Sequence, residues 1–109
     1  MTQQTTSGTA WAKVYLSGPI EIAKQVIRKH CLEQGLCVTI EPTTFIYTGS
    51  EEVGYVVGVI NYPRFPESSE EVFQHAKTLA LALLSETYQR SALVMTPEET
   101  IWIRNVAEK

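Results

Sequence analysis

The sequence has 109 residues, 44% of them hydrophobic and 19% charged, and a formal net charge of −3. Its length fits one domain with one hydrophobic core, and its composition excludes intrinsic disorder. The nine basic residues are scattered, which argues against nucleic acid as a partner. No apolar stretch nears the ~20 residues that a membrane span requires and no signal peptide is visible, so we expect a cytoplasmic protein with no membrane partner.

The N-terminal segment is polar and uncharged, with no large apolar residue after Met1. We therefore expect a disordered tail over residues 1–10, followed by a single α+β domain over residues 11–109. The first regular element is a short strand over Ala12–Leu16, in which the side chains alternate between two faces.

The segment Ser17-Gly18-Pro19 ends this strand and opens an amphipathic helix. Proline suits the first helical position, because a backbone N–H there would have no acceptor within the helix. Gly35 ends the helix as a left-handed cap, and Leu36 can pack back against the last turn. The helix N-terminus that follows Ser17 and Gly18 is a potential anion site, although the same segment also fits a purely structural turn.

Two strands follow, over Cys37–Tyr47 and Val53–Asn61, and a turn containing Gly49 joins them into a hairpin. Pro42 removes one backbone donor, so the first of these strands must lie at a sheet edge or carry a bulge. The second strand is apolar throughout, which fits the middle of a sheet.

The connection Tyr62–Pro66 contains two prolines, and we expect it to be stiff and extended. Ser68 and Glu71 then have the spacing of a capping box. The apolar stripe that follows predicts a helix to about Tyr88.

On this second helix, Leu79 and Leu83 should be buried against the sheet. Strands over Ser91–Met95 and Thr100–Arg104 complete the chain. The order β-α-β-β-α-β-β predicts a ferredoxin-like sandwich with an additional C-terminal strand, in which two helices cover one face of an antiparallel sheet. This fold hosts unrelated functions, so function must be argued from particular residues.

The other sheet face should be open. The more polar side of the Cys37–Tyr47 strand is assigned to it, and its side chains can hydrogen-bond and stack as nucleotide or peptide ligands require: Thr39, Glu41, Thr43, Phe45 and Tyr47. The Val53–Asn61 strand is apolar on both sides, which indicates that something covers the open face. We expect a second copy of the chain or a partner there, the alternative being the C-terminal strand or the N-terminal tail.

Gly54 and Gly58 share one face of their strand, where they mark either a close approach of ligand or backbone, or a local bulge. Just beyond the strand, Asn61, Tyr62 and Arg64 present an amide, a phenol and a guanidinium on a proline-rich loop. An arginine beside aromatic residues is typical of an interface or a phosphate anchor, and a structural loop is the alternative.

No metal site or cofactor is expected. Cys31 and Cys37 are spaced neither as zinc ligands nor as a redox motif, so both are interpreted as small buried hydrophobic residues. His30 and His75 belong to different helices, far apart in the sequence.

Two segments resemble known proteins. The stretch KVYLSGP resembles the strand-to-helix opening of the nucleoside deoxyribosyltransferases, which implies substrate binding at this turn, but no segment matching that family's catalytic glutamate follows. The longer phrases YLSGPIEIAKQVIRKHCLEQGLCVTIEPTTFIYTG and VVGVINYPRFP resemble short uncharacterised bacteriophage proteins. That resemblance implies an accessory protein that acts in the cytoplasm of an infected host.

The sequence contains no Ser/His/Asp, Cys/His or metal-ligand constellation, and Glu51 and Glu52 are interpreted as solvated charges. These absences favour a small non-catalytic binding protein over an enzyme. We expect a homodimer that contacts a host protein through its open sheet face and the Asn61–Phe65 loop. The alternative is a nucleotide-binding protein or a small nucleotide-processing enzyme that uses the helix N-terminus at Ser17-Gly18-Pro19.

Overall fold

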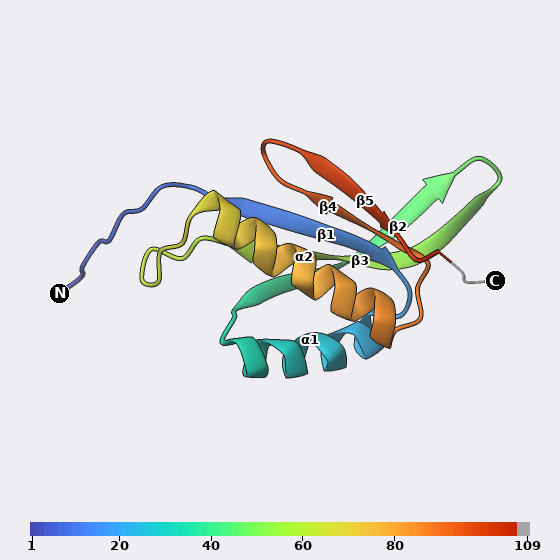
Figure 1. The fold of residues 1–109 in the computed structure, drawn as a ribbon, viewed down its shortest axis with the longest axis horizontal. Helices are drawn as coiled ribbons and strands as arrows, with labels where there is room; N and C mark the ends of the chain where they lie inside the picture. Colours follow the sequence, from blue (N-terminus) through green and yellow to red (C-terminus); the bar gives the residue numbers. More distant parts are fainter. Residues whose placement is uncertain (107–109) are drawn as a thin grey trace.

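The computed structural model describes residues 1–106 and contains helices and strands in the predicted order (Figure 1). The last residues of the expected domain, 107–109, lie outside the described residues. The elements are β1 (Trp11–Ser17), α1 (Ile20–Gln34), β2 (Val38–Tyr47), β3 (Ser50–Ile60), α2 (Ser69–Glu86), β4 (Ser91–Met95) and β5 (Thr100–Arg104).

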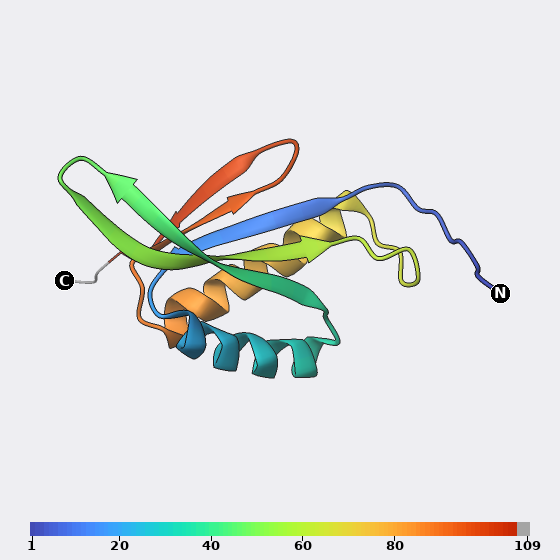
Figure 2. The same ribbon diagram turned by 180° about the vertical axis from the view of Figure 1, so that it is seen from behind.

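The strands form one five-stranded sheet in the spatial order β2-β3-β1-β4-β5, and each neighbouring pair is antiparallel. Both helices cover the same face of this sheet (Figure 1 and Figure 2). β2 is an edge strand, as Pro42 requires, and β5 extends the sheet beyond β4 at the opposite edge. The prediction of a ferredoxin-like α+β sandwich with an additional C-terminal strand is confirmed.

The hydrophobic core lies between the two helices and the covered face of the sheet. Its sheet side comes from alternate residues of the strands, since successive side chains point to opposite faces. Its helix side comes from the apolar stripes of α1 and α2, and Leu79 and Leu83 are buried as predicted. The buried hydrophobic residues are Ala10, Ala12, Val14, Leu16, Ala23, Ile27, Tyr55, Val57, Val59, Val72, Ala76, Leu79, Ala80, Leu83, Leu84, Ala92 and Val94.

Both predicted helix ends are present. Gly35 has the left-handed conformation with φ 69°, and its N–H donates to the Cys31 carbonyl at 2.8 Å. The Leu36 N–H donates to the same carbonyl at 3.1 Å, which closes the C-terminal turn of α1. At the start of α2, the Ser68 hydroxyl accepts from the Glu71 N–H at 3.1 Å and the Glu71 carboxylate accepts from the Ser68 N–H at 2.8 Å.

The interpretation of both cysteines as buried was wrong for Cys37 and holds only in part for Cys31, which packs against the core. Cys31 is only half-buried and Cys37 is exposed, because Cys37 precedes the edge strand β2 at a point where no element covers it. His30, the residue before Cys31 on α1, is buried, and its Nε2 atom has no partner among residues 1–106.

The connection from β3 to α2 is also less extended than predicted. The Phe65 N–H donates to the Tyr62 carbonyl at 2.9 Å, which closes a turn inside the proline-rich segment. The N-terminal segment contacts this region, because the Asn61 N–H donates to the Ala10 carbonyl at 2.9 Å.

Tyr55 carries the largest of the fully buried side chains, and its Oη atom is buried without a hydrogen-bond partner among residues 1–106. Burial raises the pKa of Tyr55 to about 12, so the phenol stays neutral in the core. Among residues 1–106, neither helix has the length and apolar character that crossing a membrane requires.

The apolar stripe of α2 predicts unequal effects for two leucines on that helix. Leu83 has 0% of its surface exposed, whereas Leu81 has 48% exposed. Leu83→Ala should lower the free energy of unfolding by about 2–5 kcal/mol because it leaves a cavity. Leu81→Ala should change it by less than about 0.5 kcal/mol. Denaturant titration of both variants measures the difference, and equal losses would contradict the packing described here.

Candidate functional site

The sheet face that the helices leave uncovered, called the open face below, carries the polar row predicted for β2. Thr39 and Thr43 pair across the ladder with Gly58 and Gly54 of β3, and Ser17 of β1 pairs with Gly54 from the other side. Because directly paired residues share a face, Ser17, Gly54 and Thr43 form one row across three strands.

The two glycines of β3 provide room on the open face. The β2–β3 register runs without interruption from the Val38–Val59 pair to the Tyr47–Ser50 pair, so the glycines mark no bulge. A Cβ atom at Gly54 would overlap the Phe45 ring and the Leu16 carbonyl oxygen. The Phe45 ring therefore lies over Gly54 of β3, where the side chain of any residue larger than glycine would overlap the ring.

A hydrogen bond joins the end of β1 to the β2–β3 hairpin. The Ser17 hydroxyl donates to the Glu52 carboxylate at 2.6 Å, and Glu52 pairs across the ladder with Phe45. We call Ser17, Thr43, Phe45, Glu52 and Gly54 the Ser17 corner. It combines two hydroxyl groups, a carboxylate and an aromatic ring within one end of the open face.

A cleft of about 580 Å³ adjoins the Ser17 corner on the side of α1, and Thr43 and Gly54 belong to both. The first turn of α1 lines this cleft, and no side chain among the described residues caps it, in contrast to the start of α2. Gly18 holds the turn before α1 with φ 117°, and its N–H donates to the Val53 carbonyl at 3.0 Å. The N–H groups of this first turn can therefore donate to an anion. The Glu21 carboxylate also lines the cleft, and Lys24 neutralises it with 3.3 Å between Nζ and Oε2.

The predicted loop residues lie at the other end of the sheet. Tyr62 and Arg64 line a second cleft of about 610 Å³ between the C-terminal end of α1 and the β3–α2 connection, called the loop cleft below. Asn61 does not line this cleft but lines a neighbouring one. The Arg64 guanidinium lies over the Phe65 ring, with 5.3 Å between its Cζ atom and the ring centroid. The sulfur of the Cys37 thiol lies 4.0 Å from the Tyr62 hydroxyl oxygen. That thiol raises the pKa of Tyr62.

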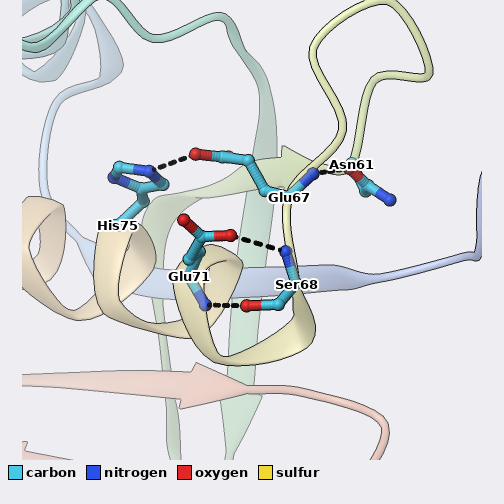
Figure 3. Close-up of polar contacts among 5 residues, drawn as sticks. All are labelled: Asn61, Glu67, Ser68, Glu71 and His75. Atoms are coloured by element: carbon cyan, nitrogen blue, oxygen red, sulfur yellow. Dashed lines mark hydrogen bonds and ion pairs between the residues drawn. The ribbon is translucent and has the colours of Figure 1, made fainter.

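Asn61 is engaged with the main chain around it (Figure 3). Its Oδ1 accepts from the Glu67 N–H at 2.7 Å, and its Nδ2 donates to the Gly8 carbonyl at 2.6 Å. The Glu67 carboxylate in turn contacts His75 Nε2 at 2.8 Å. The Asn61 amide therefore links the N-terminal segment to the end of the β3–α2 connection, and both its oxygen and its nitrogen are hydrogen-bonded.

The structure divides the predicted site residues into two groups. Ser17, Gly18 and Thr43 lie near Gly54, whereas Asn61, Tyr62 and Arg64 follow Ile60. Six residues of extended strand separate the two ends, or about 20 Å at ~3.3 Å per residue. The remaining members of the polar row are exposed on β2: Thr39, Glu41 and Tyr47.

Sequence reasoning missed Glu52, which it interpreted as a solvated charge. The available signal was its parity, because Glu52 lies two residues before Gly54 and therefore on the same face of β3. It also missed the Glu67–His75 pair, since the two residues belong to different elements. Within the described part of the chain, no group of His, Cys, Asp and Glu side chains could hold a metal ion.

No protein-family model matches this sequence, and no curated protein matches it significantly. Solved structures do match its fold. A phage SAM lyase in complex with S-methyl-5′-thioadenosine is similar with a TM-score of 0.75 and 14% sequence identity, over 96% of this chain and 96% of that chain. A phage SAM lyase in the apo state has a TM-score of 0.74 and 15% identity, over 100% of this chain and 99% of that chain.

These matches contradict the expectation of a non-catalytic binding protein, because both similar structures are enzymes and match over nearly the whole chain. The expectation that the protein is not an enzyme is contradicted for the same reason. It rested on the absence of a nucleophile–base pair or metal-ligand set, and a lyase can break a bond without either.

The surroundings of the two glycines of β3 predict that Gly54→Ala lowers the free energy of unfolding more than Gly58→Ala does. At Gly54 the new methyl group would meet the Leu16 carbonyl oxygen and the Phe45 ring, so the backbone must shift. At Gly58 it would meet only the Thr39 hydroxyl, which can rotate away. We expect Gly54→Ala to lower the free energy of unfolding by about 1–3 kcal/mol. Gly58→Ala in the same denaturant titration should cost clearly less, and the reverse order would contradict the close approach at Gly54.

Proposed function

We propose that this chain is an enzyme that cleaves S-adenosylmethionine (SAM) without water, releases S-methyl-5′-thioadenosine, and binds the nucleoside at the Ser17 corner. The observation that carries the proposal is the likeness of nearly the whole chain to a phage SAM lyase in complex with S-methyl-5′-thioadenosine. The nucleotide-processing alternative drawn from the Ser17-Gly18-Pro19 segment belongs to the same class of activity.

The chemistry of this cleavage requires few catalytic groups. Forming S-methyl-5′-thioadenosine breaks the bond between the sulfonium sulfur and the γ carbon of the aminobutyrate group. The sulfur keeps the electron pair and leaves as a neutral thioether, so no acid must protonate it. The γ carbon then forms a bond to an oxygen of the substrate's own carboxylate, or the aminobutyrate group gives its β proton to a base and gains a double bond. Because the sulfonium charge disappears, exclusion of water favours the reaction.

The residues of the Ser17 corner fit the parts of such a substrate. Phe45 offers a ring on which adenine can stack, at a place kept open by Gly54. The Glu52 carboxylate, oriented by the Ser17 hydroxyl at 2.6 Å, can accept hydrogen bonds from the ribose hydroxyls. In the adjoining cleft, the uncapped first turn of α1 can bind the substrate carboxylate.

The place of action follows from the same proposal. The sequence resembles short bacteriophage proteins, and both similar structures are phage enzymes. We infer that the protein acts in the cytoplasm of an infected bacterium, where it would lower the concentration of SAM.

We also propose that a second copy of the chain covers the open face. This face bears large apolar side chains in contact with water: Trp102 of β5 is 62% exposed and Ile60 of β3 is 41% exposed. Exposed apolar patches on one sheet face can mark an interaction surface. Covering the patch would also exclude water from the Ser17 corner, which the proposed reaction favours.

Incubation of the purified protein with SAM tests the activity, with chromatography and mass spectrometry of the products. We expect S-methyl-5′-thioadenosine together with a four-carbon lactone or unsaturated amino acid. Glu52→Gln keeps the shape of the side chain but removes its charge, so kcat/KM should fall by about 10- to 100-fold. The matched control is Glu51→Gln, because Glu51 is exposed on the opposite face of β3.

The two parts of the proposal fail separately. An inactive wild-type protein would contradict the enzyme. A wild-type activity that Glu52→Gln and Glu51→Gln leave equally intact would contradict only the assignment of the Ser17 corner.

Sedimentation equilibrium at micromolar concentration tests the covering of the open face. We expect a mass that is a multiple of the chain mass of 12.2 kDa. Trp102→Lys should shift the equilibrium toward the single chain, because it places a charge in the patch. A wild-type mass of 12.2 kDa would contradict self-association.

A further inference from the structure

The loop cleft has rigid walls. Pro63 lies inside the turn that the Phe65 N–H closes with the Tyr62 carbonyl at 2.9 Å, and Pro66 follows this turn, so both restrict the backbone. Asn61 clamps the end of the connection through the Glu67 N–H at 2.7 Å (Figure 3). A cleft of about 610 Å³ is therefore held open before any ligand arrives.

One wall of the cleft offers hydrogen-bond donors that have no acceptor. The Arg64 guanidinium makes no ion pair within residues 1–106 and lies over the face of the Phe65 ring. The Tyr62 phenol lies on the same connection, and the neighbouring Cys37 thiol keeps its pKa high, so it remains a donor. A guanidinium beside a phenol is suited to a carboxylate.

Two other residues that line the cleft offer acceptors. Glu67 is held by His75, with 2.8 Å between Oε2 and Nε2, which leaves Oε1 available. Glu71 uses Oε1 for the Ser68 N–H at 2.8 Å and has Oε2 left. Two carboxylates in the lining disfavour a simple anion, because they would repel it. They suit an ammonium group.

The lining also contains apolar side chains. Leu36 and Ile60 line the cleft together with the Phe65 ring. A ligand that satisfies all three features carries a carboxylate, an ammonium group and an apolar chain.

We propose that the loop cleft is a second binding site, for a zwitterionic α-amino acid with an apolar side chain. Its carboxylate would bind Arg64 and its ammonium group the free oxygens of Glu67 and Glu71. The site lies about 20 Å from the Ser17 corner along β3, and the inference does not depend on the lyase activity.

Isothermal titration of the full chain with L-methionine tests the site, because methionine carries both charges and an unbranched apolar side chain. We expect saturable binding with a Kd of about 1 mM or tighter. Two analogues each lack one charge: 3-(methylthio)propylamine has no carboxylate and 4-(methylthio)butanoate has no ammonium group. Both should bind at least about tenfold more weakly than methionine.

Variants locate the site. Arg64→Gln should weaken methionine binding about 10- to 100-fold, whereas Arg28→Gln, at an exposed position on α1, should not change it. Ser17→Ala at the other end of the sheet should also leave it unchanged. The proposal is overturned by the absence of saturable binding up to about 10 mM. It is equally overturned if one of the singly charged analogues binds as well as methionine, or if Arg64→Gln and Arg28→Gln behave alike.

Discussion

β3 pairs with β1 on one side and β2 on the other, and this double ladder holds both faces of the sheet in register. On the covered side it presents Tyr55 and Val57 to the core. On the open side it presents Gly54 and Gly58, over which side chains of β2 extend. A slip of one residue would exchange the two sides, exposing the apolar set and placing glycines in the core. The core therefore holds the Ser17 corner in place.

Features that act through neighbouring backbone could be predicted from the sequence. Gly35 caps a helix through bonds to Cys31, and Pro42 requires a strand with one free edge, so each is recognisable within a few residues. Glu52 was missed because its partner Ser17 lies 35 residues away and meets it only through the order of the strands. The burial of Cys37 was predicted wrongly because cysteine is usually buried. Its position beside an edge strand leaves it exposed.

Residue spacing carries no signal for the cleavage of a sulfonium, and the chemistry of the reaction explains why. Nucleophile–base pairs and metal-ligand sets are signatures of reactions that must activate water or a side chain. A sulfonium is already an activated leaving group, so a protein that cleaves it has to bind, orient and desolvate the substrate. The site that we propose consists of ordinary residues, such as Phe45, Glu52 and an uncapped helix start. No spacing rule distinguishes them in a sequence.

Chemical-shift mapping of the isotope-labelled protein with S-methyl-5′-thioadenosine tests the central claim most directly, because it reports where the nucleoside binds independently of turnover. The account predicts that the largest amide shifts occur at Ser17, Phe45 and Gly54, with no comparable shifts around Arg64. Saturable shifts confined to the loop cleft or to the outer surfaces of the helices would contradict the assignment of the nucleoside site to the open face.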